Sequence, residues 1–212
     1  MNELHFLIVF LIGICISCES PTSTPPALGA LPPPLPPTTS YPIGTPIDSL
    51  NGVYVYYNGR DILRNQGRHK SADGYNYGLK WQCVEFVKRY YYQALQHRMP
   101  NPWGHARAFF NLNLSSGAFN NERGLYQHRN GSKIQPKVND IVVFGGDTYG
   151  HVAIVAKVEA DLVELIQQNV GTQSRVQMSL SQRNGRWYMR SAKVLGWLSQ
   201  EVGENSLNLP TY

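Results

Sequence analysis

Apolar residues recur at three- and four-residue spacing along one segment in the middle of the chain, which predicts a helix with one buried face. The residues on this face are Val84, Val87, Tyr91 and Leu95. Charged residues fall on the other side, namely Glu85, Lys88 and Arg89. We expect the helix to run from residue 81 to residue 98, because Pro100 and Pro102 stop it.

The chain after this helix predicts one more helix and then an irregular region. Residues 103–110 are expected to form a short second helix, with Trp103 and Phe110 in the core or at a cleft wall and His105 at the surface. Residues 111–137 are rich in Asn, Gly, Ser and Gln. Such a composition is typical of connecting segments, so we expect little regular structure there.

Short apolar runs separated by turn signals predict strands on either side of these helices. The expected strands are residues 52–59, 140–144, 151–158, 162–169, 186–190 and 194–198. The last five follow one another along the chain, which favours an antiparallel meander. Helices followed by a meander indicate an α+β fold, with N-terminal helices packed on an antiparallel β-sheet.

The N-terminus has the pattern of an export signal. Residues 6–16 form an apolar run, which is too short for a membrane span of about 20 apolar residues. Ser17-Cys18 follows this run and resembles the lipobox of bacterial lipoproteins, in which the cysteine is acylated. We therefore expect residues 1–18 to be a signal peptide of the lipoprotein type, with Cys18 as the lipidation site. An ordinary secretory signal or a short hydrophobic anchor is the alternative.

Residues 19–46 are expected to form a proline-rich disordered tether, and residues 47–200 a single folded domain. The tether contains Pro32-Pro33-Pro34 and Pro36-Pro37 and favours extended polyproline geometry. After an export signal, it predicts a spacer that holds the domain away from a membrane, and an SH3-type ligand is the alternative. The domain has the size of one compact unit. We expect a monomer with a frayed C-terminal tail at residues 201–212.

The formal net charge of +5 is modest, and the basic residues are scattered along the chain. A nucleic-acid partner is not expected, since nucleic-acid-binding proteins gather basic residues in a patch or stripe. An anionic polymer of the cell envelope suits this charge. We expect the protein to be exported to the cell envelope and held at the membrane by its lipid anchor.

Cys83 is the one thiol that remains in the folded domain once Cys15 and Cys18 are assigned to the signal. It stands in the first turn of the predicted helix, where unpaired backbone N–H groups and the helix dipole favour an anion. A thiolate is such an anion, and this placement lowers the pKa of a cysteine. Cys83 is therefore a candidate nucleophile. The alternative is that it packs as a small buried hydrophobic residue.

His151 is the candidate base for this thiol, because it opens a predicted strand directly after Gly150. Cys–His catalysis needs an imidazole that takes the thiol proton and a third group that fixes the tautomer of the ring. Strand alternation places candidates for this third group on the two faces of the next strand. One face holds Leu165, Gln167 and Asn169, and the other holds Glu164, Ile166 and Gln168. No metal or cofactor is expected.

Four stretches of the domain carry a common pattern. They are Gln82-Cys83-Val84-Glu85-Phe86-Val87, Asn139-Asp140-Ile141-Val142-Val143-Phe144, Gly150-His151-Val152-Ala153-Ile154-Val155 and Gln167-Gln168-Asn169. In this order they resemble the CHAP domain, the family of cysteine, histidine-dependent amidohydrolases/peptidases. The stretch from Tyr77 to Tyr91 also resembles the amidase part of the bifunctional glutathionylspermidine synthetase/amidases.

The resemblance implies a papain-like (NlpC-type) α+β fold and cleavage of amide bonds. Carried over residue by residue, it makes Cys83 the nucleophile and His151 the general base. Gln167 stands where the family often has an acidic residue, and Asn169 stands where it has an asparagine. A neutral amide orients an imidazole but stabilises its positive charge less than a carboxylate does. Gln82, with the backbone N–H of Cys83, is expected to hold the oxyanion.

Most exported members of the family cut peptidoglycan, so the resemblance predicts a partner in the peptidoglycan peptide stem or crossbridge. The expected reaction is hydrolysis of the N-acetylmuramoyl–L-alanine bond or of a peptide bond, through a thioester on Cys83. Two alternatives remain open. One is an amidase that acts on a glutathionylspermidine-like conjugate, and the other is a non-catalytic protein that binds peptidoglycan, which fits the departure at Gln167.

Overall fold

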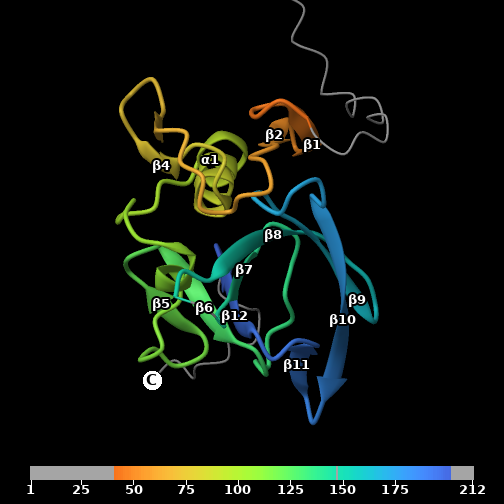
Figure 1. Ribbon diagram of the computed structural model, residues 1–212. Coiled ribbons are helices and arrows are strands. Elements are labelled where there is room, and N and C mark those ends of the chain that lie inside the picture. The colour runs from red at the N-terminus through yellow and green to blue at the C-terminus, as the bar shows by residue number, and fades with distance from the viewer. Residues whose placement is uncertain (1–40, 147, 202–212) are drawn as a thin grey trace, which may run out of the picture.

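The computed structural model describes residues 41–146 and 148–201, and Figure 1 shows its ribbon. The expected signal peptide with Cys18, most of the tether and residues 202–212 of the expected tail lie outside the described residues. Contacts of the domain begin before residue 47, because the N–H of Gly44 donates to the carbonyl of Tyr57 at 2.8 Å. Within the described part of the chain, no helix is long and apolar enough to cross a membrane.

The described residues form one eight-stranded sheet, two hairpins and one α-helix. The order of strands in the sheet is β11-β10-β9-β8-β7-β12-β6-β5, and all neighbours are antiparallel. Its strands are β5 (Ala118–Asn120), β6 (Leu125–Arg129), β7 (Ile141–Phe144), β8 (His151–Val158), β9 (Leu162–Ile166), β10 (Arg175–Arg183), β11 (Arg186–Met189) and β12 (Val194–Ser199). The hairpins are β1 (Pro46–Leu50) with β2 (Val53–Tyr56), and β3 (Arg68–Lys70) with β4 (Asn76–Leu79). The helical elements are α1 (Cys83–Leu95) and the short 3-10 helix η1 (Ala106–Phe109).

Two apolar clusters form the core, one on each face of the sheet. Successive residues of a strand point to opposite faces, so the continuous apolar run of β7 is buried on both sides. Val143 packs in the cluster that contains residues of α1, whereas Val142 packs in the cluster that contains Trp197. Leu180 of β10 and Met189 of β11 belong to the second cluster. Figure 1 shows how this is possible, since β10 and β11 curve across from β12 and the sheet covers its own second face.

The charged side of α1 is buried too, which the amphipathic pattern did not predict. Glu85 and Lys88 are 0% and 1% exposed, because the two hairpins cover this side of the helix. The ammonium group of Lys88 donates to two backbone carbonyls at 2.6 and 2.7 Å. Glu85 accepts from Nε of Arg89 at 2.6 Å and bonds Nδ1 of His69 at 2.7 Å. These partners offset the desolvation of the buried charges.

The expectation of several N-terminal helices is wrong, because α1 is the one α-helix in residues 41–146 and 148–201. α1 ends at Leu95, earlier than residue 98, since Gln96 adopts the left-handed conformation with φ 51°. In the segment 103–110, the guanidinium of Arg123 takes the carbonyls of Trp103 and Ala108 as acceptors. An α-helix over this segment would use the carbonyl of Trp103 for its own hydrogen bonds. The segment instead wraps around Arg123 and forms only η1.

Three strands of the sheet lie where no strand was expected. β5 and β6 fall within residues 111–137, and β10 falls between the expected strands at 162–169 and 186–190. β6 contains polar residues, so it lacks the apolar pattern that predicts a strand. Its buried Gln127 is satisfied because its side-chain amide bonds the backbone N–H and carbonyl of Asn111, both at 2.8 Å. β10 has Val176, Met178 and Leu180 at period two, a signal that does predict a strand.

Removal of the buried carboxylate of Glu85 is expected to destabilise the fold strongly. Glu85→Leu leaves the buried Arg89 without its charged partner, and breaking a buried ion pair costs about 3–5 kcal/mol. The matched control is Glu159→Leu, which removes the exposed ion pair with Lys157 and should change stability by less than about 1 kcal/mol. Urea unfolding of the full chain measures both free energies, and equal losses in the two variants would contradict the expectation.

Candidate active site

Cys83 is the first residue of α1, as the sequence predicted, and a sharp turn after β4 brings it there. Trp81 takes a left-handed conformation with φ 67°, which costs an aromatic residue about 1–2 kcal/mol. Its indole is held against Tyr56, with ring centroids 4.0 Å apart. Gln82 then returns to extended geometry and caps the helix. Backbone strain of this kind persists where the surrounding structure fixes a functional group, here the thiol.

His151 is the first residue of β8, and the β7–β8 turn places it opposite Phe144. Gly150 makes this turn possible, because its φ is +67° and a Cβ there would lie 2.4 Å from the carbonyl oxygen of Phe144. Any other residue would push the two strand ends apart. The position of the imidazole therefore depends on a glycine that the sequence analysis noted only as the neighbour of His151.

The structure brings Cys83 and His151 into hydrogen-bond contact, although α1 and β8 lie far apart in the sequence. Burial of the sulfur raises the pKa of Cys83, but the charge of His151 and its hydrogen bond to the sulfur outweigh this effect. The backbone N–H groups of Val152 and Val84 also favour the anion. The net result is a pKa of Cys83 below its ordinary value, so the position beside His151 stabilises the thiolate of Cys83.

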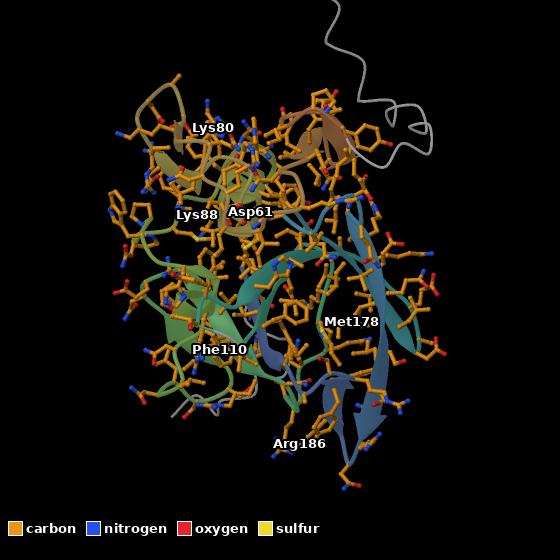
Figure 2. The ribbon with its side chains drawn as sticks, viewed as in Figure 1. Asp61, Lys80, Lys88, Phe110, Met178 and Arg186 are labelled. Atoms are coloured by element: carbon orange, nitrogen blue, oxygen red, sulfur yellow. The ribbon has the colours of Figure 1, made fainter. Side chains whose placement is uncertain are left out.

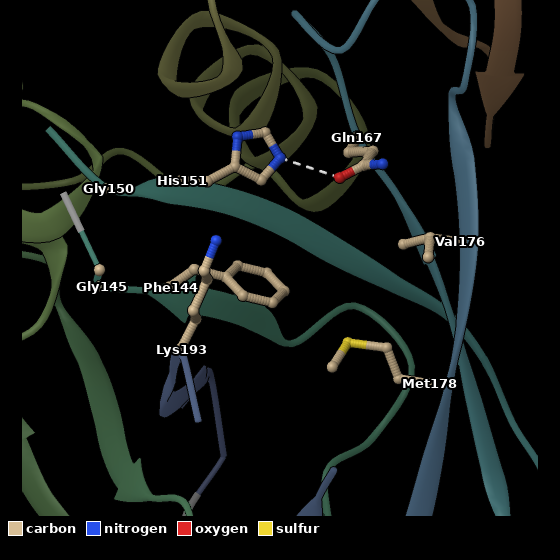
Figure 3. Close-up of a pocket in the computed structure, with 9 residues that line it drawn as sticks. Phe144, Gly145, Gly150, His151, Gln167, Val176, Met178 and Lys193 are labelled. Atoms are coloured by element: carbon tan, nitrogen blue, oxygen red, sulfur yellow. Dashed lines mark hydrogen bonds between the residues drawn. The ribbon is translucent and has the colours of Figure 1, made fainter. Parts of the chain in front are cut away.

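Gln167 is the third residue of the candidate site, and its Oε1 lies 2.9 Å from Nε2 of His151 (Figure 3). Its orientation is fixed, since Nε2 of Gln167 donates to the carbonyl of Gln173 at 3.1 Å. The amide oxygen must therefore face the imidazole, which makes Nε2 of His151 the protonated nitrogen of the neutral ring. Nδ1 is left for the thiol of Cys83. Gln167 thus fixes the tautomer of His151 that a general base needs.

Asn169 lies away from His151 and contacts Gln82 instead. The alternation that placed Gln167 and Asn169 on one face requires a strand to residue 169, but β9 ends at Ile166 and Asn169 has φ 70°. Its Nδ2 donates to Oε1 of Gln82 and to the carbonyl of Ile62, both at 2.8 Å. Its Oδ1 accepts from Asn58 at 2.8 Å. Among the described residues, the side-chain bond to His151 that fixes its ring comes from Gln167.

The side chain of Gln82 is fully engaged in the loop before β3. Its Nε2 donates to the carbonyls of Ile62 at 3.0 Å and Arg64 at 2.9 Å, and its Oε1 accepts from Asn169. A primary amide has two N–H donors, so both are in use. Gln82 precedes Cys83 in the chain, but its amide nitrogen donates to the carbonyls of Ile62 and Arg64.

Gln168 and Glu85 support the site; the sequence offered Gln168 only as a candidate to orient His151 and gave Glu85 no role in the site. Nε2 of Gln168 donates to the carbonyl of Gln82 at 3.0 Å and to Oε2 of Glu85 at 2.8 Å. Its Oε1 accepts from the backbone N–H of Tyr56 at 2.7 Å. The amide thereby joins the chain after β9 to the first turn of α1 and to β2. A signal was present in the sequence, since Gln168 falls between two candidate residues in a run of three amides.

Glu85 stays ionised where it contacts the amide of Gln168. Burial alone raises the pKa of Glu85, but its hydrogen bond with His69 and the charge of Arg89 bring the pKa below its ordinary value. A carboxylate in the first turn also interacts well with the positive end of the helix dipole. The buried anion therefore anchors the helix end that carries Cys83.

A pocket of about 400 Å³ opens beside the imidazole. It is lined by Phe144, Gly145, Gly146, Gly150, His151, Gln167, Val176, Met178 and Lys193. Figure 3 shows the apolar side chains of β10 on one side of it and the imidazole with Gln167 above. Cys83 does not line the pocket, so the pocket lies on the histidine side of the thiol. In residues 41–146 and 148–201 no cluster of acidic, histidine or cysteine side chains is suited to hold a metal ion.

Comparison with known proteins matches this region to one family. Residues 73–169 match the CHAP domain. Bifunctional glutathionylspermidine synthetase/amidase of Escherichia coli (strain K12) is 28% identical over 193 residues, which cover 80% of this chain and 31% of that protein. Glutathionylspermidine synthase of Crithidia fasciculata is 32% identical over 109 residues, which cover 44% of this chain and 14% of that protein. The chain thus spans about a third of the length of the Escherichia coli relative.

The matched residues contain the candidate catalytic residues, from Cys83 at the start of α1 to Asn169 after β9. The helix packed on an antiparallel sheet is consistent with the papain-like fold that the resemblance implied. The resemblance drawn from the four sequence stretches is confirmed. Residues 73–169 thus match the CHAP domain, and this match together with the amidase relatives supports a hydrolase that acts on amide bonds.

Proposed function

We propose that this protein is a cysteine amidase in which Cys83 is the nucleophile, His151 the general base and Gln167 the residue that orients His151. The observation that carries the proposal is the contact between the Cys83 thiol and an imidazole whose other nitrogen is bound to a fixed amide oxygen at 2.9 Å. Nucleophile, base and orienting group are the three parts that thiol catalysis requires.

The reaction has two steps. The Cys83 thiolate attacks the amide carbonyl, and the imidazolium of His151 gives its proton to the leaving nitrogen as the C–N bond breaks. The acyl group is now a thioester on Cys83, and the amine departs. His151 then takes a proton from water, the hydroxide attacks the thioester, and the carboxylic acid leaves as the thiolate and the imidazolium are restored.

The oxyanion of each tetrahedral intermediate needs donors that point at it. The backbone N–H of Cys83 is one, since the first N–H groups of a helix have no partner within the helix. The amide of Gln82 is the second, and it becomes available when the carbonyl of Ile62 gives way to the substrate oxygen. Asn169 holds the other end of the Gln82 amide and keeps it at the thiol.

For the substrate we propose peptidoglycan, cleaved at the N-acetylmuramoyl–L-alanine bond or within the peptide stem or crossbridge. Support comes from the lipobox-like Cys18, the proline-rich segment after it and the net charge of +5, which suits an anionic polymer of the cell envelope. We accordingly propose that the protein is exported and anchored at the membrane by an acylated Cys18. A monomer fits this role.

The second candidate substrate is a glutathionylspermidine-like conjugate. The likeness to the bifunctional glutathionylspermidine synthetase/amidase favours it, because it covers 80% of this chain and includes the candidate site. The two candidates share the chemistry of Cys83 and differ in the amine that leaves. That amine is an amino acid or peptide in peptidoglycan and a polyamine in the conjugate.

Replacement of the nucleophile is expected to abolish hydrolysis. The full chain, purified in detergent, should release soluble fragments from peptidoglycan sacculi, and Cys83→Ala should release none, because it lacks the thiol that lies beside His151 and forms the thioester. Mass spectrometry of the fragments identifies the bond that is cut. A wild type that is as inert as Cys83→Ala on sacculi, glutathionylspermidine and model amides would refute the proposed enzyme.

Alkylation of Cys83 is expected at mildly acidic pH, since the lowered pKa of its thiol keeps the thiolate populated below the ordinary cysteine value of about 8.5. The rate of iodoacetamide labelling is measured on the peptide that contains Cys83, by mass spectrometry, across the pH range. His151→Ala removes the charge that lowers the pKa, so its labelling profile should move to higher pH. If the two profiles coincide, the thiol and the imidazole are not coupled.

Changes at Gln167 are expected to alter catalysis in two directions. Gln167→Ala frees the imidazole and should lower kcat by on the order of 10²-fold, the lower end of what general acid–base catalysis contributes. Gln167→Glu keeps the hydrogen bond and adds a negative charge that stabilises the imidazolium of His151. The alkaline limb of the pH–rate profile should therefore move to higher pH.

The matched control for Gln167 is Gln173→Ala, because Gln173 binds Gln167 through its backbone carbonyl and its own side chain is exposed. This variant should keep the kcat and the pH profile of the wild type. A pH profile of Gln167→Glu identical to that of the wild type would show that residue 167 does not act through His151.

A further inference from the structure

The pocket beside His151 has an apolar wall that comes mostly from a strand outside the four family stretches. Val176 and Met178 of β10 face it, together with Phe144 at the end of β7 (Figure 3). The floor is made by Gly145 and Gly146, which bring no side chains into the space. Such a concave, largely apolar space with a few polar groups is the usual form of a small-molecule subsite.

Lys193 supplies the one permanent positive charge among the nine residues that line the pocket. In Figure 3 its side chain extends upward, so that the amine lies between Phe144 and His151. Gly146 makes room for this course, because a Cβ there would lie 3.3–3.6 Å from three carbons of the Lys193 stem. The backbone is fixed too, since the carbonyl of Lys193 accepts from the N–H of Gly145 at 2.8 Å. The ammonium group is therefore directed into the pocket.

The position of the pocket decides which part of a substrate it meets. His151 gives its proton to the leaving nitrogen, so this nitrogen must lie within hydrogen-bond reach of the imidazole. The acyl part of the substrate becomes bonded to Cys83, which does not line the pocket. The group that meets Phe144, Met178 and Lys193 is therefore the one attached to the leaving nitrogen.

We propose that this pocket is the leaving-group subsite and that Lys193 selects leaving amines that carry a carboxylate, that is, an amino acid or peptide and not a polyamine. The inference rests on the proposed amide hydrolysis and identifies the substrate class of the same site. The carboxylate would meet the ammonium of Lys193, and the side chain of the leaving residue would lie against Val176 and Met178. A polyamine would bring positive charges to the same ammonium and be repelled.

The test compares two matched substrates with the full chain in detergent. One is a set of soluble muropeptides with free carboxylates, and the other is the same set after conversion of the carboxylates to carboxamides. Glutathionylspermidine is the third substrate. For Lys193→Met we expect about a fivefold loss of kcat/KM on the free acids, carried by KM, as for an exposed charge pair. The carboxamides should be cleaved equally well by the wild type and this variant.

Two further readouts isolate the charge. The KM of the wild type for the free acids should rise with salt, whereas that of Lys193→Met should not, because screening acts only where a charge pair exists. Lys193→Glu should reverse the preference and favour the carboxamides. The matched control is Lys157→Met, at the other end of β8 from His151, which should leave all three substrates unaffected.

The outcomes separate the inference from the function on which it rests. If muropeptides are cleaved and the ratio of free acid to carboxamide is the same in wild type and Lys193→Met, the subsite inference fails and the amidase stands. If the wild type cleaves glutathionylspermidine and no muropeptide, the inference and the peptidoglycan assignment both fail, but the cysteine amidase stands. If the wild type matches Cys83→Ala on every substrate, the proposed function itself fails.

Discussion

The contact between Cys83 and His151 is the interaction on which the rest of the site depends. One partner begins a helix and the other begins a strand, and the two elements are held together by packing of α1 on the sheet. The contact lowers the pKa of a thiol that burial alone would raise. The lowered pKa of the buried thiol therefore depends on helix and sheet keeping their relative position.

Much of the polar interior can be understood as support for that position. The amide of Gln168 links the start of α1 to the sheet and to the first hairpin. Its nitrogen also donates a hydrogen bond to the carboxylate of Glu85. Glu85 is in turn paired with Arg89 and hydrogen-bonded to His69. Buried polar groups that are all paired contribute to a unique arrangement, whereas a single unpaired one would destabilise it. The helix that carries the nucleophile is thus enclosed on its charged side as well as on its apolar side.

The two ends of the active site differ in what they offer a substrate. Near the thiol, the Gln82 amide holds the carbonyl of Ile62, so the donor that we propose for the oxyanion is occupied by a carbonyl oxygen. On the other side of His151 lies an open pocket with an apolar wall and the amine of Lys193. The family accounts for the chemistry at the thiol. We propose that discrimination between substrates depends on β10 and on the chain before β12, which lie outside the matched residues 73–169.

The sequence by itself predicted the family, the candidate nucleophile and base, and five of the eight strands of the large sheet, because these depend on local signals. A cysteine after a turn and before an amphipathic run marks a helix start, and Gly150-His151 before an apolar run marks the start of a strand. Only the tertiary structure decided that Asn169 serves Gln82, since the end of β9 at Ile166 breaks the alternation on which the sequence argument relied. It also decided that 103–110 wraps around Arg123 and that the polar β6 is a buried strand. In each case the local pattern is overruled by hydrogen bonds to residues distant in the sequence, which no spacing along the chain can report.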